Sequence, residues 1–335
     1  MPSELKTLSE VYRKVHRLKL IRYLSSKKAN KECYGYLLED RAVCLNSLAE
    51  ASSVKFPSLF RDFVALGQSA WINAENLFEE SSEKVVACAS TPVSQVRLLA
   101  PIDLPPKIIC LGLNYRDHVM ETGGAIPDEP VIFMKPRTAV IGPDNMIVKP
   151  SFVRELDYEA ELAIVIGKRV KDVSVSEARS CIFGYTILND VSARDVQFKD
   201  KQWTRGKGFD TFAPTGPCVV TADQLQDVSN LSVRTWINGD LRQDSTTKKM
   251  IFDVYEIIHH LSRVMTLEPC DIIATGTPSG VGFAMKPPRF LQAGDNVRIE
   301  IEKIGILENK VVESGQSDNS SQIRPLKVSI PHGEH

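Results

Sequence analysis

The sequence predicts an α+β fold that is mostly β-structure, on three observations. From residue 107 onward, short apolar runs are separated by Gly, Pro, Asn and Asp, a spacing typical of a β-rich roll, barrel or sandwich. Only residues 174–181 and 252–265 of that region have clear helical spacing. The first hundred residues mix strand and helix patterns. We therefore expect a small N-terminal α+β domain at 19–100 and a β-rich domain at 101–313.

The composition is that of an ordinary globular protein. It has 335 residues, 43% of them hydrophobic and 25% charged, with a net charge of -1. A charge near zero gives no reason to expect nucleic acid or an anionic membrane as partner. No apolar run approaches the roughly 20 residues that span a bilayer. The seven cysteines are dispersed without C-x-x-C, which favours reduced, buried thiols in a cytoplasmic compartment over a disulfide framework or a zinc site. The alternative location is an organellar matrix, because the basic half of residues 1–19 resembles a poor organellar leader.

The elements of the N-terminal region follow from local patterns. Residues 1–18 predict an amphipathic helical extension, and residues 57–80 predict one helix that Gly67 weakens in the middle. Residues 81–106 are polar and then Pro-rich, which predicts a linker. Strand patterns joined by a turn at Glu39-Asp40 occur at 19–26, 32–40 and 41–50.

The larger region contains eight strand patterns, and the polar stretch 314–335 after it predicts a loosely ordered tail. Each pattern is a short apolar run that ends in turn-forming residues. The patterns lie at 107–115, 130–135, 160–167, 183–190, 216–222, 231–239, 271–280 and 296–305.

Two acids enter one of these strands. Glu159 and Glu161 are two residues apart, so in a strand they project from the same face. The apolar run after them, "AIVIG", indicates burial. Adjacent buried carboxylates repel one another and lose hydration, so protons, cationic partners or a metal must compensate. The alternative is an edge strand on which these acids are solvated.

A third acid, Asp190, ends the apolar run "GYTILND" at a strand-to-loop junction. Three carboxylates without a neighbouring His or Cys make an all-oxygen site, which suits Mg²⁺, Mn²⁺ or Ca²⁺. Such a site leaves coordination positions for water or substrate. Taken alone, Asp190 is equally well explained as a turn or cap residue.

The stretch "GLNYRDHVMETG" contains a candidate catalytic pair. His118 and Glu121 are three residues apart and share one face of a helical turn. A carboxylate beside an imidazole raises its basicity and fixes its orientation, as a general base requires. The alternative is an ordinary surface pair.

Two glycine-rich stretches are candidate anion contacts. Lys207 lies between glycines in "GKGFD", and Thr277 lies in "ATGTPSGVG", whose hydroxyl and amides, including that of Gly276, suit a carboxylate. Neither stretch matches a P-loop or G-x-G-x-x-G, so a nucleotide site is not expected. The alternative for both is a glycine-rich turn.

Five motifs together resemble the fumarylacetoacetate hydrolase superfamily, over roughly residues 107–313: "GLNYRDH", E-x-E, "NDVSARDVQ", "GKGFD" and "TGTPSG", in that order. The resemblance implies a β-rich roll around Mg²⁺ or Mn²⁺, usually in a homodimer. It implies that Glu159, Glu161 and Asp190 bind the metal. It further implies that His118 and Glu121 form a catalytic dyad on a lid loop.

The same resemblance implies further roles at the site. Arg194, Gln197, Lys207 and Thr277 would contact substrate or support the site, and Asp195 would be structural, paired to an arginine. The contiguous H-x-x-E is similar to the acylpyruvase and oxaloacetate tautomerase branches more than to fumarylacetoacetase itself.

These residues predict a metal-dependent enzyme that acts on a short 2-oxo acid through a metal-stabilised enolate. The main prediction is C–C bond hydrolysis of an acylpyruvate or a fumarylacetoacetate-like substrate. The alternatives are keto–enol tautomerisation or isomerisation of oxaloacetate or a hydroxymuconate-type diacid, and decarboxylation of oxaloacetate. A catalytically inactive metal-binding protein is a further alternative. The dyad and Lys207 argue against it, because a structural metal site needs neither.

Overall fold

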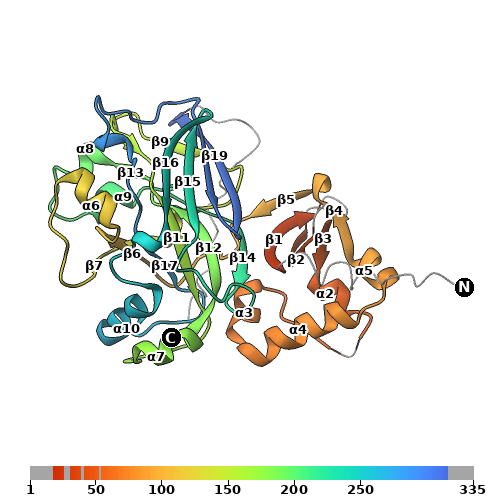
Figure 1. The fold of residues 1–335 in the computed structure, drawn as a ribbon. Coiled ribbons are helices and arrows are strands. Elements are labelled where there is room, and N and C mark those ends of the chain that lie inside the picture. Colours follow the sequence, from red (N-terminus) through yellow and green to blue (C-terminus); the bar gives the residue numbers. More distant parts are fainter. Residues whose placement is uncertain (1–17, 26–30, 39–40, 53, 316–335) are drawn as a thin grey trace, which may run out of the picture.

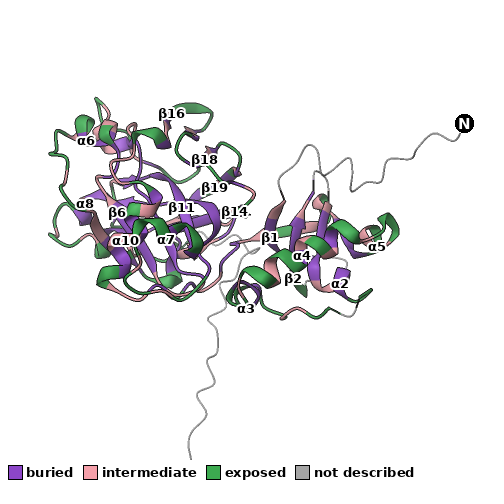
Figure 2. Cartoon of the chain, turned by 60° about the horizontal axis from the view of Figure 1, so that its bottom comes forward, coloured by how far each residue is buried: buried purple, intermediate pink, exposed green. Residues whose placement is uncertain are grey.

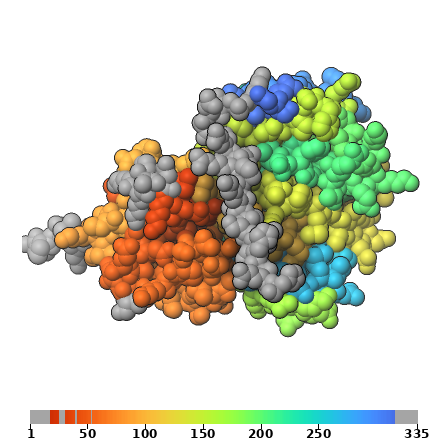
Figure 3. Space-filling model, turned by 180° about the vertical axis from the view of Figure 1, so that it is seen from behind, coloured from red at the N-terminus to blue at the C-terminus, as the bar shows by residue number. Residues whose placement is uncertain are grey.

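The computed structural model describes residues 18–25, 31–38, 41–52 and 54–315. The helix predicted for residues 1–18 falls almost wholly outside these ranges. The turn predicted at Glu39-Asp40 and the tail beyond residue 315 also lie outside them. Figure 1 shows a small N-terminal part beside a larger part, and Figure 3 shows them from behind as two adjoining lobes.

The N-terminal part packs short strands against helices through aromatic side chains. The Tyr34 ring lies 5.3 Å from that of Phe60, and the Trp71 ring lies 4.6 Å from that of Phe183 in the larger part. The elements are β1 (Lys19–Ser25), β2 (Lys31–Leu37), β3 (Arg41–Cys44), α2 (Leu45–Ala49), α3 (Phe60–Ala65), α4 (Gln68–Glu80), α5 (Glu83–Ala89), β4 (Ser90–Pro92) and β5 (Val96–Leu99).

Three local predictions for this part need correction. The single helix expected over 57–80 is two, because Gly67 has a φ of 84°, outside the helical region, and caps the N-terminus of α4. The strand expected at 41–50 ends at Cys44 and continues as helix α2. The linker expected over 81–106 instead contains α5, β4 and β5. Turn-forming residues separate these three short elements. The polar composition of the segment hid their helix and strand patterns in the sequence.

One twelve-stranded sheet runs through both parts of the molecule. Its main path is β4-β3-β2-β1-β14-β12-β11-β17-β6-β7, and the pairing of β1 with β14 joins the parts. The path is open, so the described strands do not close into a barrel. On this path, the strands from the larger part are β6 (Ile108–Gly112), β7 (Val131–Lys135), β11 (Ala160–Ile166), β12 (Ile182–Asn189), β14 (Ala213–Thr221) and β17 (Ile272–Ala274).

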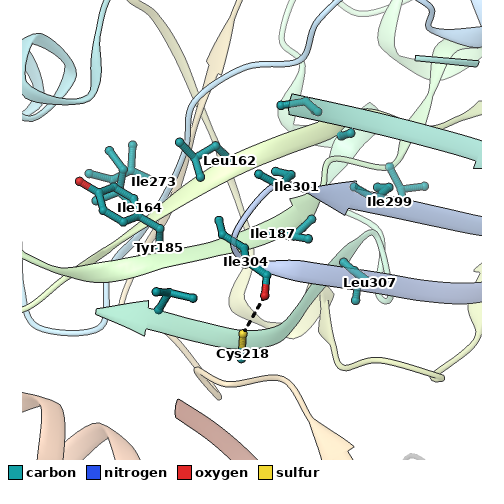
Figure 4. Close-up of a cluster of buried hydrophobic side chains, with 14 of the residues drawn as sticks. Leu162, Ile164, Tyr185, Ile187, Cys218, Ile273, Ile299, Ile301, Ile304 and Leu307 are labelled. Carbon is teal, nitrogen blue, oxygen red and sulfur yellow. Dashed lines mark hydrogen bonds between the residues drawn. The ribbon is translucent and has the colours of Figure 1, made fainter. Parts of the chain in front are cut away.

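A five-stranded sheet packs against one face of β11 and β12. Leu162 and Ile187 of the central sheet belong to the same apolar cluster as Ile299 and Ile301, as Figure 4 shows. The Cys218 thiol there donates to the Ile304 carbonyl at 3.4 Å. This sheet has the order β16 (Asp240–Thr246), β15 (Ser232–Ile237), β18 (Asn296–Ile301), β19 (Gly305–Glu313) and β9 (Ile147–Lys149).

Shorter elements complete the larger part. The predicted helices at 174–181 and 252–265 are present as α7 and α10, and Asp253 and Glu256 form a capping box at the start of α10. None of the described helices is long and apolar enough to cross a membrane. The remaining elements are β8 (Val140–Ile141), β10 (Leu156–Asp157), β13 (Ser192–Ala193), α6 (Arg116–Thr122), α7 (Val175–Ala178), α8 (Arg194–Gln197), α9 (Thr204–Lys207) and α10 (Val254–Val264).

Burial follows this layering. In Figure 2 the central strands are buried, whereas helices such as α4 and α5 keep exposed outer faces. Every residue of β11 is buried, because β12 and β17 flank it and both of its faces are covered. Six of the seven cysteines are buried as well, all except Cys88. A polar side chain on β11 therefore lies deep in the protein.

Candidate active site

The three predicted acids meet at the ends of β11 and β12. The register of these strands pairs Ala160 with Asn189, which brings Glu159 and Glu161 beside Asp190. One carboxylate oxygen from each acid lies within 4.8 Å of the others. Their exposed fractions are 5%, 0% and 0%. The prediction of burial is confirmed, and the edge-strand alternative is wrong because β11 is an interior strand.

Three buried cations compensate much of this negative charge. Lys207 Nζ donates to Glu159 Oε2 and to Asp190 Oδ2, both at 2.7 Å. Lys135 Nζ donates to the other oxygen of Asp190, and Arg194 Nη2 lies 2.6 Å from Glu159 Oε1. Burial acts to raise the pKa of Glu159, but Lys207 and Arg194 outweigh it and hold that pKa well below its usual range. Glu159 is therefore ionised.

Lys135 is a site residue that the sequence analysis did not single out. It is the last residue of the apolar strand β7 and is 3% exposed. Its ammonium also donates to the Val191 carbonyl at 3.1 Å. In the sequence, a lysine at the end of an apolar strand looks like an ordinary solvent-exposed charge. Only the fold shows that Lys135 faces Asp190.

Glu161 is the acid without enough partners. Its Oε2 accepts the Gly276 N–H at 2.7 Å, whereas its Oε1 is buried without a hydrogen-bond partner among the described residues. Burial raises the pKa of Glu161 well above its usual range, and the negative charges of Asp190 and Glu159 raise it further. A divalent cation among the three acids would satisfy this oxygen and relieve the repulsion. The all-oxygen donor set therefore fits Mg²⁺, Mn²⁺ or Ca²⁺.

The predicted dyad lies on the short helix α6. His118 Nδ1 is 2.8 Å from Glu121 Oε1, and Glu121 Oε2 accepts the Gly280 N–H at 2.9 Å. A carboxylate only accepts hydrogen bonds, so Nδ1 carries the proton and Nε2 is left as the basic nitrogen. His118 is 7% exposed. The His118 imidazole is therefore buried, whereas Glu121 is exposed.

Asp117, which the sequence analysis missed, holds this helix in place. Its Oδ2 accepts hydrogen bonds from Ser245 at 2.7 Å, Lys249 at 3.0 Å and Ser279 at 3.1 Å. Its Oδ1 accepts the His118 N–H at 3.0 Å. These bonds connect α6 to the five-stranded sheet and to the loop after β17.

A cavity of about 250 Å³ lies between His118 of the dyad and Glu159 of the acid triad. His118, Glu159 and Lys207 line it, together with Thr277 and the predicted contacts Arg194 and Gln197. Most of the remaining wall is apolar, formed by Leu111, Leu113, Phe133, Phe198, Trp203 and Phe283.

Arg194 and Gly276, predicted as substrate contacts, make contacts within the protein that the sequence did not suggest. Arg194 donates to Asp157 Oδ2 and to Gln197 Oε1, both at 2.9 Å, and its guanidinium lies 4.3 Å from the Phe283 ring centre. The Gly276 amide is bonded to Glu161 and does not line the cavity. It therefore supports an acid, whereas the sequence analysis expected a contact with substrate.

Two aspartates near Arg194 differ from expectation. Asp195 accepts the backbone N–H of Arg154 at 2.9 Å, so its arginine partner contributes an amide and not a side chain. Asp157, which the sequence analysis did not single out, is fully buried and accepts the Gly282 N–H at 2.8 Å as well as the Arg194 bond. It joins Arg194 to the loop that carries Phe283.

The geometry agrees with the comparison to protein families. The family described as "Fumarylacetoacetate (FAA) hydrolase C-terminal" matches residues 107–312, which include the acids, the dyad and the cavity wall. The chain belongs to this family. The resemblance that five short motifs indicated is thereby confirmed.

Relatives and solved structures place the chain within the same superfamily. It is 42% identical over 306 residues to "Fumarylacetoacetate hydrolase domain-containing protein 2 homolog" of Dictyostelium discoideum, covering 88% of this chain and 97% of that one. It is 42% identical over 297 residues to "Oxaloacetate tautomerase fahd2, mitochondrial" of Xenopus laevis, covering 88% and 90%. A fumarylacetoacetate hydrolase structure from Exiguobacterium antarcticum matches with a TM-score of 0.75 and 36% identity, covering 88% and 99%.

Proposed function

We propose that the protein is a divalent-cation-dependent enzyme that moves a proton at carbon 3 of a short 2-oxo acid. The observation that carries the proposal is that one cavity is lined both by His118, with its basic nitrogen available, and by Glu159 of the acid triad. In that triad, one buried oxygen of Glu161 has no partner among the described residues. A protein that only binds metal would need the triad alone. The oriented dyad is accounted for by proton transfer.

Glu159, Glu161 and Asp190 are the residues that would hold the cation. When bound, a cation such as Mg²⁺ or Mn²⁺ supplies Lewis-acid stabilisation of the charge that develops on the oxygens of a 2-oxo acid. Lys207 holds two of these carboxylates together, because its ammonium donates to Glu159 and to Asp190 at 2.7 Å. The protein thus maintains the negative charge that a cation requires.

The chain's own residues account for the proton transfer. His118 Nε2 accepts a proton from carbon 3, while the hydrogen bond from Nδ1 to Glu121 stabilises the imidazolium that forms. Thr277 and Lys207 lie in the same wall, where a hydroxyl and an ammonium suit the anionic oxygens of the substrate. The aromatic wall of Phe133, Phe198 and Trp203 limits access of water to the reacting carbon.

The same residues serve two outcomes. In a tautomerisation, the proton that His118 takes from carbon 3 is returned to an oxygen of the substrate, or the reverse. In the C–C hydrolysis that the sequence predicts, His118 instead takes a proton from water, which attacks the distal carbonyl of an acylpyruvate; the C–C bond then breaks, and carbon 3 of the pyruvate enolate that leaves takes up a proton. The Xenopus relative named as an oxaloacetate tautomerase supports the first, and the Exiguobacterium structure named as a fumarylacetoacetate hydrolase supports the second. Decarboxylation of oxaloacetate is the further alternative: loss of CO₂ leaves the enolate of pyruvate, and carbon 3 then takes up a proton.

An ultraviolet assay on chelator-stripped protein distinguishes the outcomes. Oxaloacetate and acetylpyruvate are each tested with and without Mg²⁺ or Mn²⁺, and pyruvate is quantified at the end. Metal-dependent enol–keto conversion of oxaloacetate without pyruvate identifies a tautomerase, and pyruvate with matching acetate from acetylpyruvate identifies a hydrolase. Pyruvate from oxaloacetate identifies a decarboxylase. Activity that is unchanged by chelation would contradict the proposal.

The predictions of a homodimer and of a cytoplasmic location stay predictions. The Xenopus relative is named as mitochondrial, which makes an organellar matrix the alternative location to test for this chain.

A further inference from the structure

Gln243 of β16 is fully buried and lies between the acids and the loop that carries Thr277. The sequence analysis did not single it out, and it does not line the cavity. All four hydrogen bonds that its side-chain amide can make are present. Its Oε1 accepts from the Ala160 N–H at 3.1 Å and the Thr235 hydroxyl at 2.8 Å. Its Nε2 donates to Thr277 Oγ1 and to the Pro278 carbonyl, both at 2.9 Å.

The backbone fixes which way this amide points. The Ala160 N–H only donates, so it requires the amide oxygen of Gln243. The Pro278 carbonyl only accepts, so it requires the amide nitrogen. The reversed amide would set N–H against N–H at Ala160 and oxygen against oxygen at Pro278. The orientation of the amide is therefore determined by two groups that cannot change their roles.

This orientation determines the polarity of the Thr277 hydroxyl. Because Thr277 Oγ1 accepts the Gln243 N–H, its own proton must point elsewhere. In the part of the chain that the structure describes, no hydrogen bond leads from this hydroxyl to a protein acceptor. Thr277 is 4% exposed and lines the cavity. Its O–H is therefore free to donate to an acceptor bound in that cavity.

We propose that Gln243 is a positioning residue that makes Thr277 a dedicated hydrogen-bond donor to an anionic oxygen of the substrate. The inference rests on the proposed function, because it takes the cavity to be the substrate site. It adds a requirement on the ligand: at Thr277 the site selects an acceptor such as a carboxylate or enolate oxygen, and it disfavours a donor such as an amine or amide N–H. The Ala160 bond also ties this selection to the strand between Glu159 and Glu161.

Two substitutions separate this role from simple packing. Gln243→Glu keeps oxygens for Ala160 and Thr235 but replaces the donor to Thr277 with a second acceptor, so the Thr277 proton is drawn to the new carboxylate and away from the cavity. Thr277→Val removes the hydroxyl. Thr235→Val is the matched control, because it removes a bond to the same amide on the side remote from Thr277.

The probe is oxalate, a planar dianion with the oxygen pattern of a 2-oxo acid enolate, titrated calorimetrically in saturating Mn²⁺. We expect Q243E and T277V each to raise the Kd of oxalate by about ten- to a hundredfold, the range for losing a hydrogen bond to a charged group. The double variant should bind no more weakly than T277V alone, because both changes remove the same bond. T235V should bind oxalate like the wild type.

Turnover of whichever 2-oxo acid proves active gives a second readout, in which Q243E should raise KM more than it lowers kcat. In T277V, which adds no charge near the acids, Mn²⁺ affinity without oxalate should stay near that of the wild type. If Q243E does not fold, Gln243→Met enters the same cycle, and its loss should again vanish in the T277V background.

Losses that add in the double variant, or a Q243E protein that binds oxalate normally, would overturn the role of Gln243 while leaving the proposed function intact. A wild type that binds no oxalate with Mn²⁺ would instead overturn the proposed function, and the inference with it.

Discussion

The two sides of the active-site cavity are built in different ways. The charged floor consists of Glu159, Glu161, Asp190, Lys135, Lys207 and Arg194, and none of these residues is more than 5% exposed. The opposite side is α6, residues 116–122, called the lid helix here after the lid loop that the family resemblance implies, and only His118 and Val119 of its seven residues are buried. The floor is fixed by the register of interior strands. The lid helix is held mainly by side-chain hydrogen bonds at Asp117 and Glu121.

The difference separates binding from catalysis. Charges in the floor lie in a low-dielectric interior, where each one depends on its partners and an unpaired carboxylate destabilises the fold. The lid helix can lose one hydrogen bond without disturbing the core. Substitutions in the floor should therefore change metal binding and stability together, and substitutions in the lid helix should change turnover alone.

The largest effect is expected from Glu161→Gln in the floor. Losing this ligand should weaken Mn²⁺ binding by more than about a hundredfold, because removing even a residue that only hydrogen-bonds to a metal ligand costs about 10- to 100-fold. Turnover should fall to background. The same change relieves repulsion from Asp190 and Glu159, which raises the pKa of Glu161 together with burial. In chelator, the variant should therefore melt about 2–4 °C higher than the wild type.

Calorimetric titration of Mn²⁺ and thermal melting in EDTA measure the two halves of this prediction. The wild type should gain melting temperature when Mn²⁺ is added, and the variant should not. Asp195→Asn is a suitable control, because Asp195 is outside the triad and accepts a backbone N–H. A variant that melts lower than the wild type in EDTA would show that Glu161 is not strained by its neighbours.

Much of the floor could be predicted from the sequence, because strand alternation is a strong rule. Two acids at i and i+2 in a strand share one face, the apolar run after them favoured burial, and Asp190 ended the next apolar run. Lys135, Asp157 and Gln243 could not be found this way. Each is one polar residue on a strand, and its role depends on which strand lies beside it, which is a long-range property that local patterns do not contain.

The sequence was less informative where elements are short. Helix α6 was expected only as a helical turn in a loop, and β16 and β19 had no strand pattern that the analysis used. The sequence paired His118 with Glu121, as the structure does. The resemblance to a family supplied roles for Lys207 and Thr277, but not the partners that orient them. Those partners are two carboxylates for Lys207 and Gln243 for Thr277.

A smaller but still large effect is expected from Glu121→Gln in the lid helix. The Gly280 N–H only donates, so the new amide must turn its oxygen to Gly280 and its nitrogen to His118 Nδ1. His118 then carries its proton on Nε2 and cannot act as the base. We expect kcat to fall about 10²–10⁴-fold, with Mn²⁺ affinity and melting temperature unchanged.

His118→Ala is the comparison for this variant. Because both changes remove one function, the double variant should be no slower than H118A. Steady-state kinetics at saturating Mn²⁺ checks this. A loss of Mn²⁺ affinity in E121Q would contradict the separation of lid from floor.

The smallest effect is expected from Asp117→Asn, which tests how the lid helix is held. The serine hydroxyls at 245 and 279 can rotate to accept from the new amide, but the Lys249 ammonium cannot, so only that contact becomes unfavourable. Lys249 is 44% exposed, and an exposed ion pair contributes at most about 1 kcal/mol, so kcat/KM should fall about three- to fivefold. Lys249→Met should give a similar loss, and added salt should shrink both differences by weakening the wild-type pair.

Hydrogen exchange of residues 116–123 is the decisive measurement for this contact, because it should quicken in D117N while exchange in β11 stays slow.

The pH dependence of this exchange has a definite sign. Burial acts to raise the pKa of Asp117, but hydrogen bonds from Ser245 and Lys249 outweigh it and lower that pKa. The ionised Asp117 therefore stabilises the docked α6 helix at any pH above the usual aspartate pKa. This stabilisation is lost as the pH falls through the lowered pKa. The wild type should therefore exchange like D117N only in acid, and equal exchange of the two proteins at neutral pH would mean that Asp117 does not hold the lid helix against the sheet.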